Sequence, residues 1–108
     1  MSHRTEQVGE VMQRGISAVL LRDIEGPRDC LITIMRVEVT PDLREAKVFV
    51  SILPERVTGT AMNLLERKKR EIQRLLNEHL TMKFSPRITW ELDLTTRKYA
   101  AIDEALKK

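Results

Sequence analysis

The chain has 108 residues, of which 42% are hydrophobic and 32% are charged, a mixture typical of a single globular domain spanning residues 1–108. Its apolar runs are too short to cross a bilayer, and its polar N-terminus lacks the apolar segment of a secretory signal, so we expect a cytoplasmic protein. One cysteine excludes an intrachain disulfide, and with only two histidines it argues against a metal site or other bound cofactor.

The excess of basic over acidic residues is confined to the middle of the chain. The net charge is only +3. Residues 1–53 contain seven basic and eight acidic residues, residues 54–87 contain eight and four, and residues 88–108 contain four of each. A local excess of one sign is typical of a nucleic-acid site.

The first apolar pattern predicts a helix over residues 5–21, because its apolar residues recur every three or four positions. Gly9 and Gly15 weaken this prediction, because each lowers the stability of a helix by about 1 kcal/mol relative to Ala. Pro27 has no amide hydrogen, so we expect the helix to end before it.

Two strands follow, over residues 31–40 and 45–53, because both stretches are rich in β-branched residues and alternate in polarity. In the first strand we expect Met35, Val37 and Val39 to share one face. Pro41 and Asp42 favour a turn between the strands, which predicts an antiparallel hairpin. In the second strand the apolar face contains Ala46, Val48, Val50 and Ile52.

The last third predicts a long helix over residues 58–80, a third strand over 85–94 and a short C-terminal helix over 99–108. We expect Trp90 to pack in the core with Ile88 and Leu92 rather than to stack on a base. The fold class is therefore α+β, with the order helix, strand, strand, helix, strand and short helix.

A helical wheel of residues 58–80 separates an apolar stripe from a basic one. Arg67, Arg70 and Arg74 share the exposed side, where they can be simply solvated or can contact RNA. The spacings Glu66–Arg70 and Arg74–Glu78 predict local ion pairs. The apolar stripe contains Ala61, Leu64, Leu65, Ile72, Leu75, Leu76 and His79, and we expect His79 to be a packed core side chain.

Lys68 does not fit a straight helix, because it falls inside the apolar stripe. Either its stem lies along the apolar surface and its ammonium reaches water, or the helix kinks near residues 67–70. We favour the kink, which would expose Lys68 and free backbone N–H groups suited to binding phosphate.

Nothing in the sequence predicts catalysis. Cys30 is interpreted as a small filler beside the first strand, since neither histidine is linked to it as a base. The carboxylates Asp42, Asp93 and Asp103 are not paired in a way that acid–base chemistry requires.

The hairpin resembles the ribosome-binding factor A family. The motif residues are 26–28 (GPR), 37–43 (VEVTPDL) and 46–50 (AKVFV). Residues 72–93 are similar to the family's second helix half, basic turn and third strand. Asp93, Thr95 and Ile102 fit its C-terminal signature, in which serine is usual in place of Thr95.

This resemblance implies a type II KH-like fold, in which helices pack on one face of a three-stranded mixed sheet and the second helix is kinked. It also implies a protein that is not an enzyme and has no small-molecule substrate or membrane partner. Such a protein would be a monomer that binds the 30S ribosomal subunit and its 16S rRNA during assembly, assisting late 16S maturation and cold adaptation.

The sequence departs from the family at the kink, where Lys68, Lys69 and Arg70 replace the family's Ala-x-Gly and no GXXG loop is present. This departure argues against KH-style gripping of single-stranded RNA and favours long basic side chains that reach phosphates. The predicted RNA-binding residues are Arg67, Lys68, Lys69, Arg70 and Arg74, with Lys83 and Arg87 as weaker candidates. The alternative is a protein–protein interaction module that retains the KH-like fold.

Overall fold

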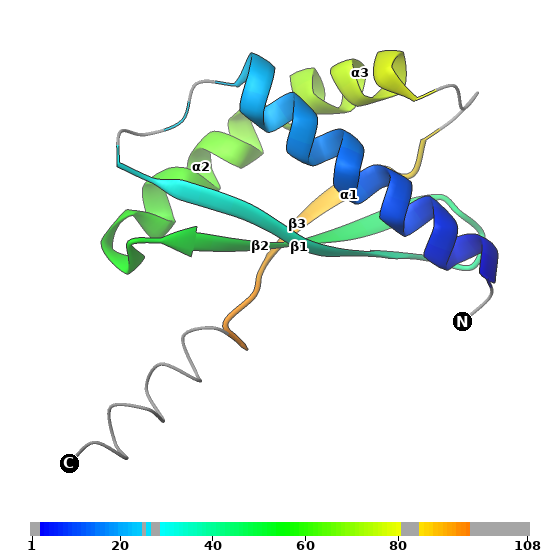
Figure 1. Ribbon diagram of the computed structural model, residues 1–108, viewed down its shortest axis with the longest axis horizontal. Coiled ribbons are helices and arrows are strands. Elements are labelled where there is room, and N and C mark those ends of the chain that lie inside the picture. Colours follow the sequence, from blue (N-terminus) through cyan, green and yellow to red (C-terminus); the bar gives the residue numbers. More distant parts are fainter. Residues whose placement is uncertain (1–2, 25, 27–28, 81–84, 96–108) are drawn as a thin grey trace.

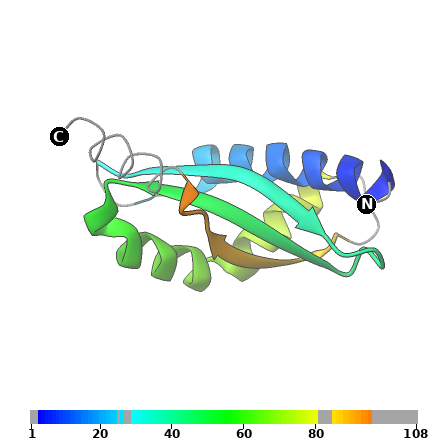
Figure 2. The same ribbon diagram turned by 90° about the horizontal axis from the view of Figure 1, so that it is seen from below.

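Helices and strands form two layers in the computed structural model, which describes residues 3–24, 26, 29–80 and 85–95. The helices lie on one side of the sheet in Figure 1, and Figure 2 shows the molecule turned by 90° and seen from below. In chain order the elements are α1 (His3–Asp23), β1 (Leu31–Val39), β2 (Glu45–Leu53), the 3-10 turn η1 (Glu55–Val57), α2 (Thr58–Arg67), α3 (Lys69–His79) and β3 (Arg87–Leu92).

The two glycines of α1 lie where the helix packs closely against its neighbours. A Cβ atom on Gly9 would lie 2.7 Å from the carbonyl oxygen of Val37, and one on Gly15 would lie 2.6 Å from Cδ1 of Leu76. Both residues are buried. The helical cost of these glycines is therefore offset by close packing of α1 against β1 and α3.

The predicted hairpin is present, with β1 and β2 antiparallel from Leu31↔Leu53 to Val39↔Ala46. A β-bulge lies between Ile34 and Arg36. The expectation that Met35 shares a face with Val37 and Val39 is wrong, because the extra residue of a bulge shifts the alternation. Ile34 is buried instead, and Met35 is 40% exposed.

The sheet is mixed, with the order β1-β2-β3 and β3 parallel to β2. The connection between these parallel strands consists of η1, α2 and α3, so the helix pair covers the sheet beside α1. The order α-β-β-α-α-β is that of the predicted type II KH-like fold, and the helices pack on one face as expected. The predicted C-terminal helix over residues 99–108 lies outside the described residues.

One hydrophobic core lies between the layers. The alternating face of β2 is fully buried as predicted, and Trp90 is 7% exposed, so its predicted core position is confirmed. The buried apolar residues of this core are Met12, Ile16, Val19, Ile34, Val39, Ala46, Val48, Val50, Ile52, Ala61, Leu65, Ile72, Leu76, Leu80, Ile88 and Trp90.

Candidate nucleic-acid interface

Five basic residues surround the junction of α2 and α3, and we call them the basic cluster. Arg67 is the last residue of α2, and Lys69 and Arg70 begin α3. Lys68 lies between the two helices, and Arg74 follows one turn into α3. In Figure 1 the junction lies on the helical side of the sheet, where α2 and α3 meet at an angle.

The predicted kink is confirmed. Lys68 has φ −92° and ψ 3°, outside the usual helical geometry. Its N–H donates to the Leu64 carbonyl at 2.9 Å, and its own carbonyl accepts from the N–H of Ile72 at 2.8 Å. The break turns the Lys68 side chain away from the core, leaving it 45% exposed.

The three arginines of the predicted stripe are divided between the two helices. A helical wheel assumes one continuous axis, whereas Arg67 belongs to α2 and Arg70 and Arg74 belong to α3. All three arginines are exposed. The first turn of α3 lies inside the basic cluster and receives no side-chain cap from Lys68, so N–H groups typical of a helix start lie among the cations.

Three cations of the basic cluster are paired with glutamates of α2 or α3. Lys69 Nζ lies 3.0 Å from Glu66, and Lys68 Nζ lies 3.5 Å from Glu71. The third pair joins Arg74 to Glu78 at 3.1 Å, as its spacing predicts. The predicted pairing of Glu66 with Arg70 is wrong, because the break disrupts the four-residue spacing.

Arg67 and Arg70 differ from these three cations. Both are exposed, and neither forms an ion pair with any residue that the structure describes. Exposed ion pairs are worth at most about 1 kcal/mol, so Lys68, Lys69 and Arg74 can exchange their partners readily. The basic cluster therefore combines two cations without acidic partners and three with weakly held ones.

The structure does not bring Arg87 to the basic cluster. Arg87 alternates with the buried Ile88 on β3, so its side chain lies on the sheet face opposite the helices. There it is 75% exposed and pairs with Glu45 at 3.0 Å. Lys83 lies outside the described residues.

Two polar side chains, whose hydrogen bonds the sequence analysis did not predict, join the β3 region to the helices. Gln73 Nε2 donates to the carbonyl of Pro86 at 3.1 Å, and Gln73 Oε1 accepts from the N–H of Ile88 at 3.0 Å. Trp90 Nε1 donates to the carbonyl of Leu65 at 3.0 Å. Of these bonds, only that of Trp90 could have been anticipated from the sequence, because the N–H of a buried indole usually has a hydrogen-bond partner.

The carboxylates weighed as catalytic candidates make local bonds. Asp42 accepts from the Thr40 hydroxyl at 2.6 Å and from the Arg44 N–H at 3.1 Å, and these bonds lower its pKa. The Thr95 hydroxyl and N–H, together with Arg36, hold the pKa of Asp93 below its ordinary value. Asp103 lies outside the described residues.

The structure bears on two further kinds of site, a reactive thiol and a metal site. Burial raises the pKa of the half-buried Cys30 thiol, which disfavours the reactive thiolate. No group of three potential metal ligands occurs within the described residues.

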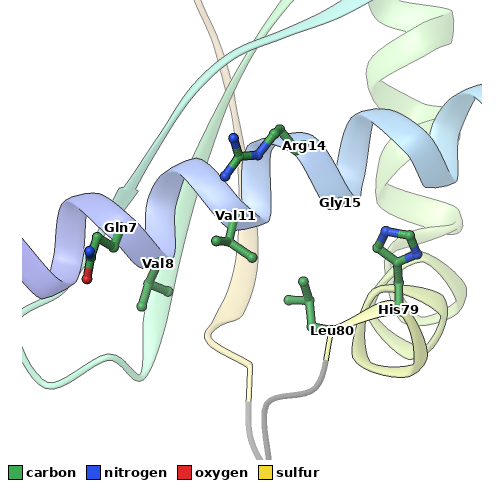
Figure 3. Close-up of a pocket in the computed structure, with 7 residues that line it drawn as sticks. All are labelled: Gln7, Val8, Val11, Arg14, Gly15, His79 and Leu80. Atoms are coloured by element: carbon green, nitrogen blue, oxygen red, sulfur yellow. The ribbon is translucent and has the colours of Figure 1, made fainter.

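A groove separates α1 from the end of α3 (Figure 3). It has a volume of about 580 Å³, and its lining includes Val8, Val11, Leu80, Arg14 and His79. His79 is exposed, so the expectation that it packs in the core is wrong. It is the last residue of α3, and its side chain lines the groove.

Comparison with known proteins identifies the family. The family model described as ribosome-binding factor A matches residues 4–106. The chain belongs to the ribosome-binding factor A family. A ribosome-binding factor A from Caldicellulosiruptor saccharolyticus is 37% identical over 97% of this chain and 81% of its own length. Another from Roseiflexus castenholzii is 38% identical over all of this chain and 85% of its own length.

Solved structures of the family have the same fold. A solution structure of a Thermotoga maritima protein, described as a putative ribosome-binding factor A, has a TM-score of 0.67 at 28% identity, covering 84% of this chain and 88% of that one. The crystal structure of ribosome-binding factor A from Thermus thermophilus has a TM-score of 0.71 at 18% identity, covering 82% and 94%. A homology model of the Thermus thermophilus protein fitted into a map of a 30S complex has a TM-score of 0.66 at 23% identity, covering 89% and 98%.

Family membership places the chain among ribosome-binding factors and not in a known class of enzyme. Among the helices of the described residues, none has the length and apolar character needed to cross a membrane.

Proposed function

We propose that this protein is an assembly factor of the small ribosomal subunit. It binds 16S rRNA within immature 30S particles as a cytoplasmic monomer and assists the late maturation of that RNA, including in the cold. Family membership supports the ribosomal partner, since the related Thermus thermophilus protein has been fitted into the map of a 30S complex.

The basic cluster is the proposed RNA-contacting surface. The observation that carries this assignment is the exposure of Arg67 and Arg70 without an acidic partner among the described residues. Guanidinium groups bind phosphate through paired N–H donors. Lys68, Lys69 and Arg74 would add contacts by exchanging their glutamates for phosphates, and Lys83 and Arg87 would contribute less.

The mode of contact follows from the side chains at the break. The junction contains long basic residues and no glycine, so the RNA backbone is not drawn against the protein backbone as in a GXXG grip. Phosphate contacts of this kind fix the position of the protein on a folded RNA without reading its sequence.

Co-sedimentation with purified small subunits tests the proposal. The triple variant K69E/R70E/R74E should no longer co-sediment with small subunits. The control R22E/R44E/K47E changes the net charge equally at exposed positions elsewhere and should remain bound. Unchanged binding by the first variant would show that the site is wrong. Failure of the unaltered protein to sediment with small subunits would show that the function is wrong.

The alternative, a protein–protein interaction module, has the groove between α1 and α3 in its favour, because the surface of its lining is mostly apolar and Val8, Val11 and Leu80 lie within it (Figure 3). The dependence of binding affinity on salt concentration distinguishes the two functions. Phosphate contacts predict a log–log slope of affinity against salt of about −0.7 to −0.9 per phosphate. A nearly flat response would favour a protein partner in the groove.

A further inference from the structure

The junction of α2 and α3 is bent without the residues that usually bend a helix. Sharp kinks occur mostly at proline, at small residues, or where another group enters the hydrogen-bond ladder. Residues 66–71 read ERKKRE, with neither proline nor glycine. The third cause therefore has to be sought in the surrounding structure.

The buried carbonyl at the break accepts a hydrogen bond from another element. In an unbroken helix the Leu65 carbonyl would accept from the N–H of Lys69. Here α2 ends at Arg67, and the Leu65 carbonyl accepts from Trp90 Nε1 of β3 at 3.0 Å. Leu65 has no exposed surface, whereas Glu66 and Arg67 are exposed. Leu65 is thus the residue at the junction whose carbonyl most needs a partner within the protein.

The same hydrogen bond disfavours a straight helix. Trp90 is 7% exposed, so its N–H also needs a partner inside the protein. In a straight helix the Leu65 carbonyl oxygen would have to accept from the Lys69 N–H as well as from the indole, on its two lone pairs, and sharing the oxygen would weaken its bond to the indole. A buried donor left unpaired is strongly unfavourable, so the indole favours the broken form.

We propose that Trp90 is a positioning residue for the basic cluster. Its indole N–H draws the Leu65 carbonyl out of the helical ladder, holds the break at Lys68 and so sets the direction in which α3 presents Lys69 and Arg70. Trp90 packs in the core, on the sheet face covered by the helices, and acts through the helix. The effect on RNA binding rests on the proposed function, whereas the effect on the break does not.

Amide hydrogen exchange, measured residue by residue by NMR, tests the effect on the break. Trp90→Phe keeps an aromatic ring in the core and removes the N–H. If the helix straightens, the Lys69 amide gains the Leu65 carbonyl as acceptor and its exchange slows by about tenfold or more. The control Val48→Ala removes packing beside Trp90 in the sheet register and leaves the indole in place. It should leave exchange at Lys69 unchanged or faster.

If Trp90 only stabilised the fold, Trp90→Phe would make the Lys69 amide exchange faster and not slower, because the amides of a destabilised protein exchange faster throughout. Unchanged or faster exchange at Lys69 in Trp90→Phe would overturn the proposal. If this variant does not fold, the unaltered protein supplies a second measurement. A through-hydrogen-bond coupling between Trp90 Nε1 and the Leu65 carbonyl carbon is expected, and its absence would overturn the proposal.

Binding to small subunits tests the positioning effect. We expect Trp90→Phe to bind about tenfold more weakly, the loss of about one charge-assisted contact, and Val48→Ala to bind normally once its folded fraction is taken into account. Slower exchange at Lys69 with normal binding would show that the break does not position the basic cluster. If the unaltered protein does not bind small subunits, the proposed function fails, while the exchange result still decides the role of Trp90 at the break.

Discussion

The basic cluster and the open face of the sheet are both exposed and rich in charge, but their charges are arranged differently. We use open face for the side of the sheet opposite the helices. There Glu38 pairs with Lys47 in register, and Arg87 bonds Glu45. Positive and negative residues alternate across the strands, so their fields largely cancel. In the basic cluster the cations outnumber the glutamates, which leaves a field that can attract phosphate.

Arg36 and Arg67 illustrate this difference. The Arg36 guanidinium lies 3.8 Å from the centre of the Phe49 ring and bonds both Asp93 and Glu38. Its interactions are satisfied within the protein, whereas Arg67 has no ion pair with the described residues. Charge marks a binding surface only where the fold leaves it unpaired, and each prediction below tests this statement on one of the two surfaces.

The largest expected effect is the loss of the two unpaired arginines. R67Q/R70Q should bind small subunits about 100-fold more weakly, since two charge-assisted contacts contribute about 3 kcal/mol in total. The matched control R44Q/K47Q removes two exposed cations near the hairpin and should bind within about twofold of the unaltered protein. Equal losses in both variants, measured by titration at one salt concentration, would show that only net charge matters.

The complementary change on the open face should affect stability alone. R36A removes the contact with Phe49 and two bonds to carboxylates, so the free energy of unfolding should fall by about 1 kcal/mol. Urea denaturation measures this change. Binding to small subunits should be unaltered, and a loss of affinity in folded R36A would place part of the interface on the sheet.

The contrast between the two surfaces was visible in the sequence only in part. The basic excess of residues 54–87 and the misfit of Lys68 in a helical wheel predicted both the surface and the kink. The pairing of Glu66 with Lys69 rather than Arg70 was not predictable, because both partners lie within reach on a helix surface and the break decides between them.

The fold was predictable wherever apolar and polar residues alternate with one constant period along a whole helix or strand. The four buried residues of β2 and the helix–strand order follow from periodicity alone. The prediction for Met35 was wrong because a bulge shifts the alternation without a sequence signal. The prediction for His79 was wrong because this last residue of α3 lines the groove beside α1 and is exposed there. The bond from Trp90 to Leu65 joins residues 25 positions apart, so only the packed structure reveals it.

A smaller effect is expected from releasing a paired cation of the basic cluster. E66Q frees the Lys69 ammonium, now 3.0 Å from Glu66, to bind phosphate without competition. Affinity for small subunits should rise about twofold, in keeping with the about 0.5 kcal/mol typical of an exposed helical pair. The control E38Q removes a carboxylate from the open face and should not change affinity. Tighter binding by both variants would mean that acidic residues act only through net charge.

The smallest effect concerns pH and the open face. Thr95 and Arg36 hold the pKa of Asp93 below its ordinary value, which is about 3.9 in an unfolded chain. A lowered folded-state pKa stabilises the protein above the unfolded value, and this contribution is lost as pH falls through the folded-state pKa. D93N should therefore be less stable than the unaltered protein near pH 6, and the difference should shrink as the solution becomes more acidic than pH 4.

Denaturation curves for D93N at several pH values check this expectation, with D42N as a comparison. Asp42 also has a lowered pKa, held by bonds within the hairpin turn, so D42N should follow the same pH trend. A difference that stays constant with pH would mean that Asp93 stabilises the fold through packing and not through its charge. Because Asp93 is paired on the open face, D93N should bind small subunits normally at neutral pH, whereas weakened binding would show that this carboxylate helps to orient a surface that contacts the ribosome.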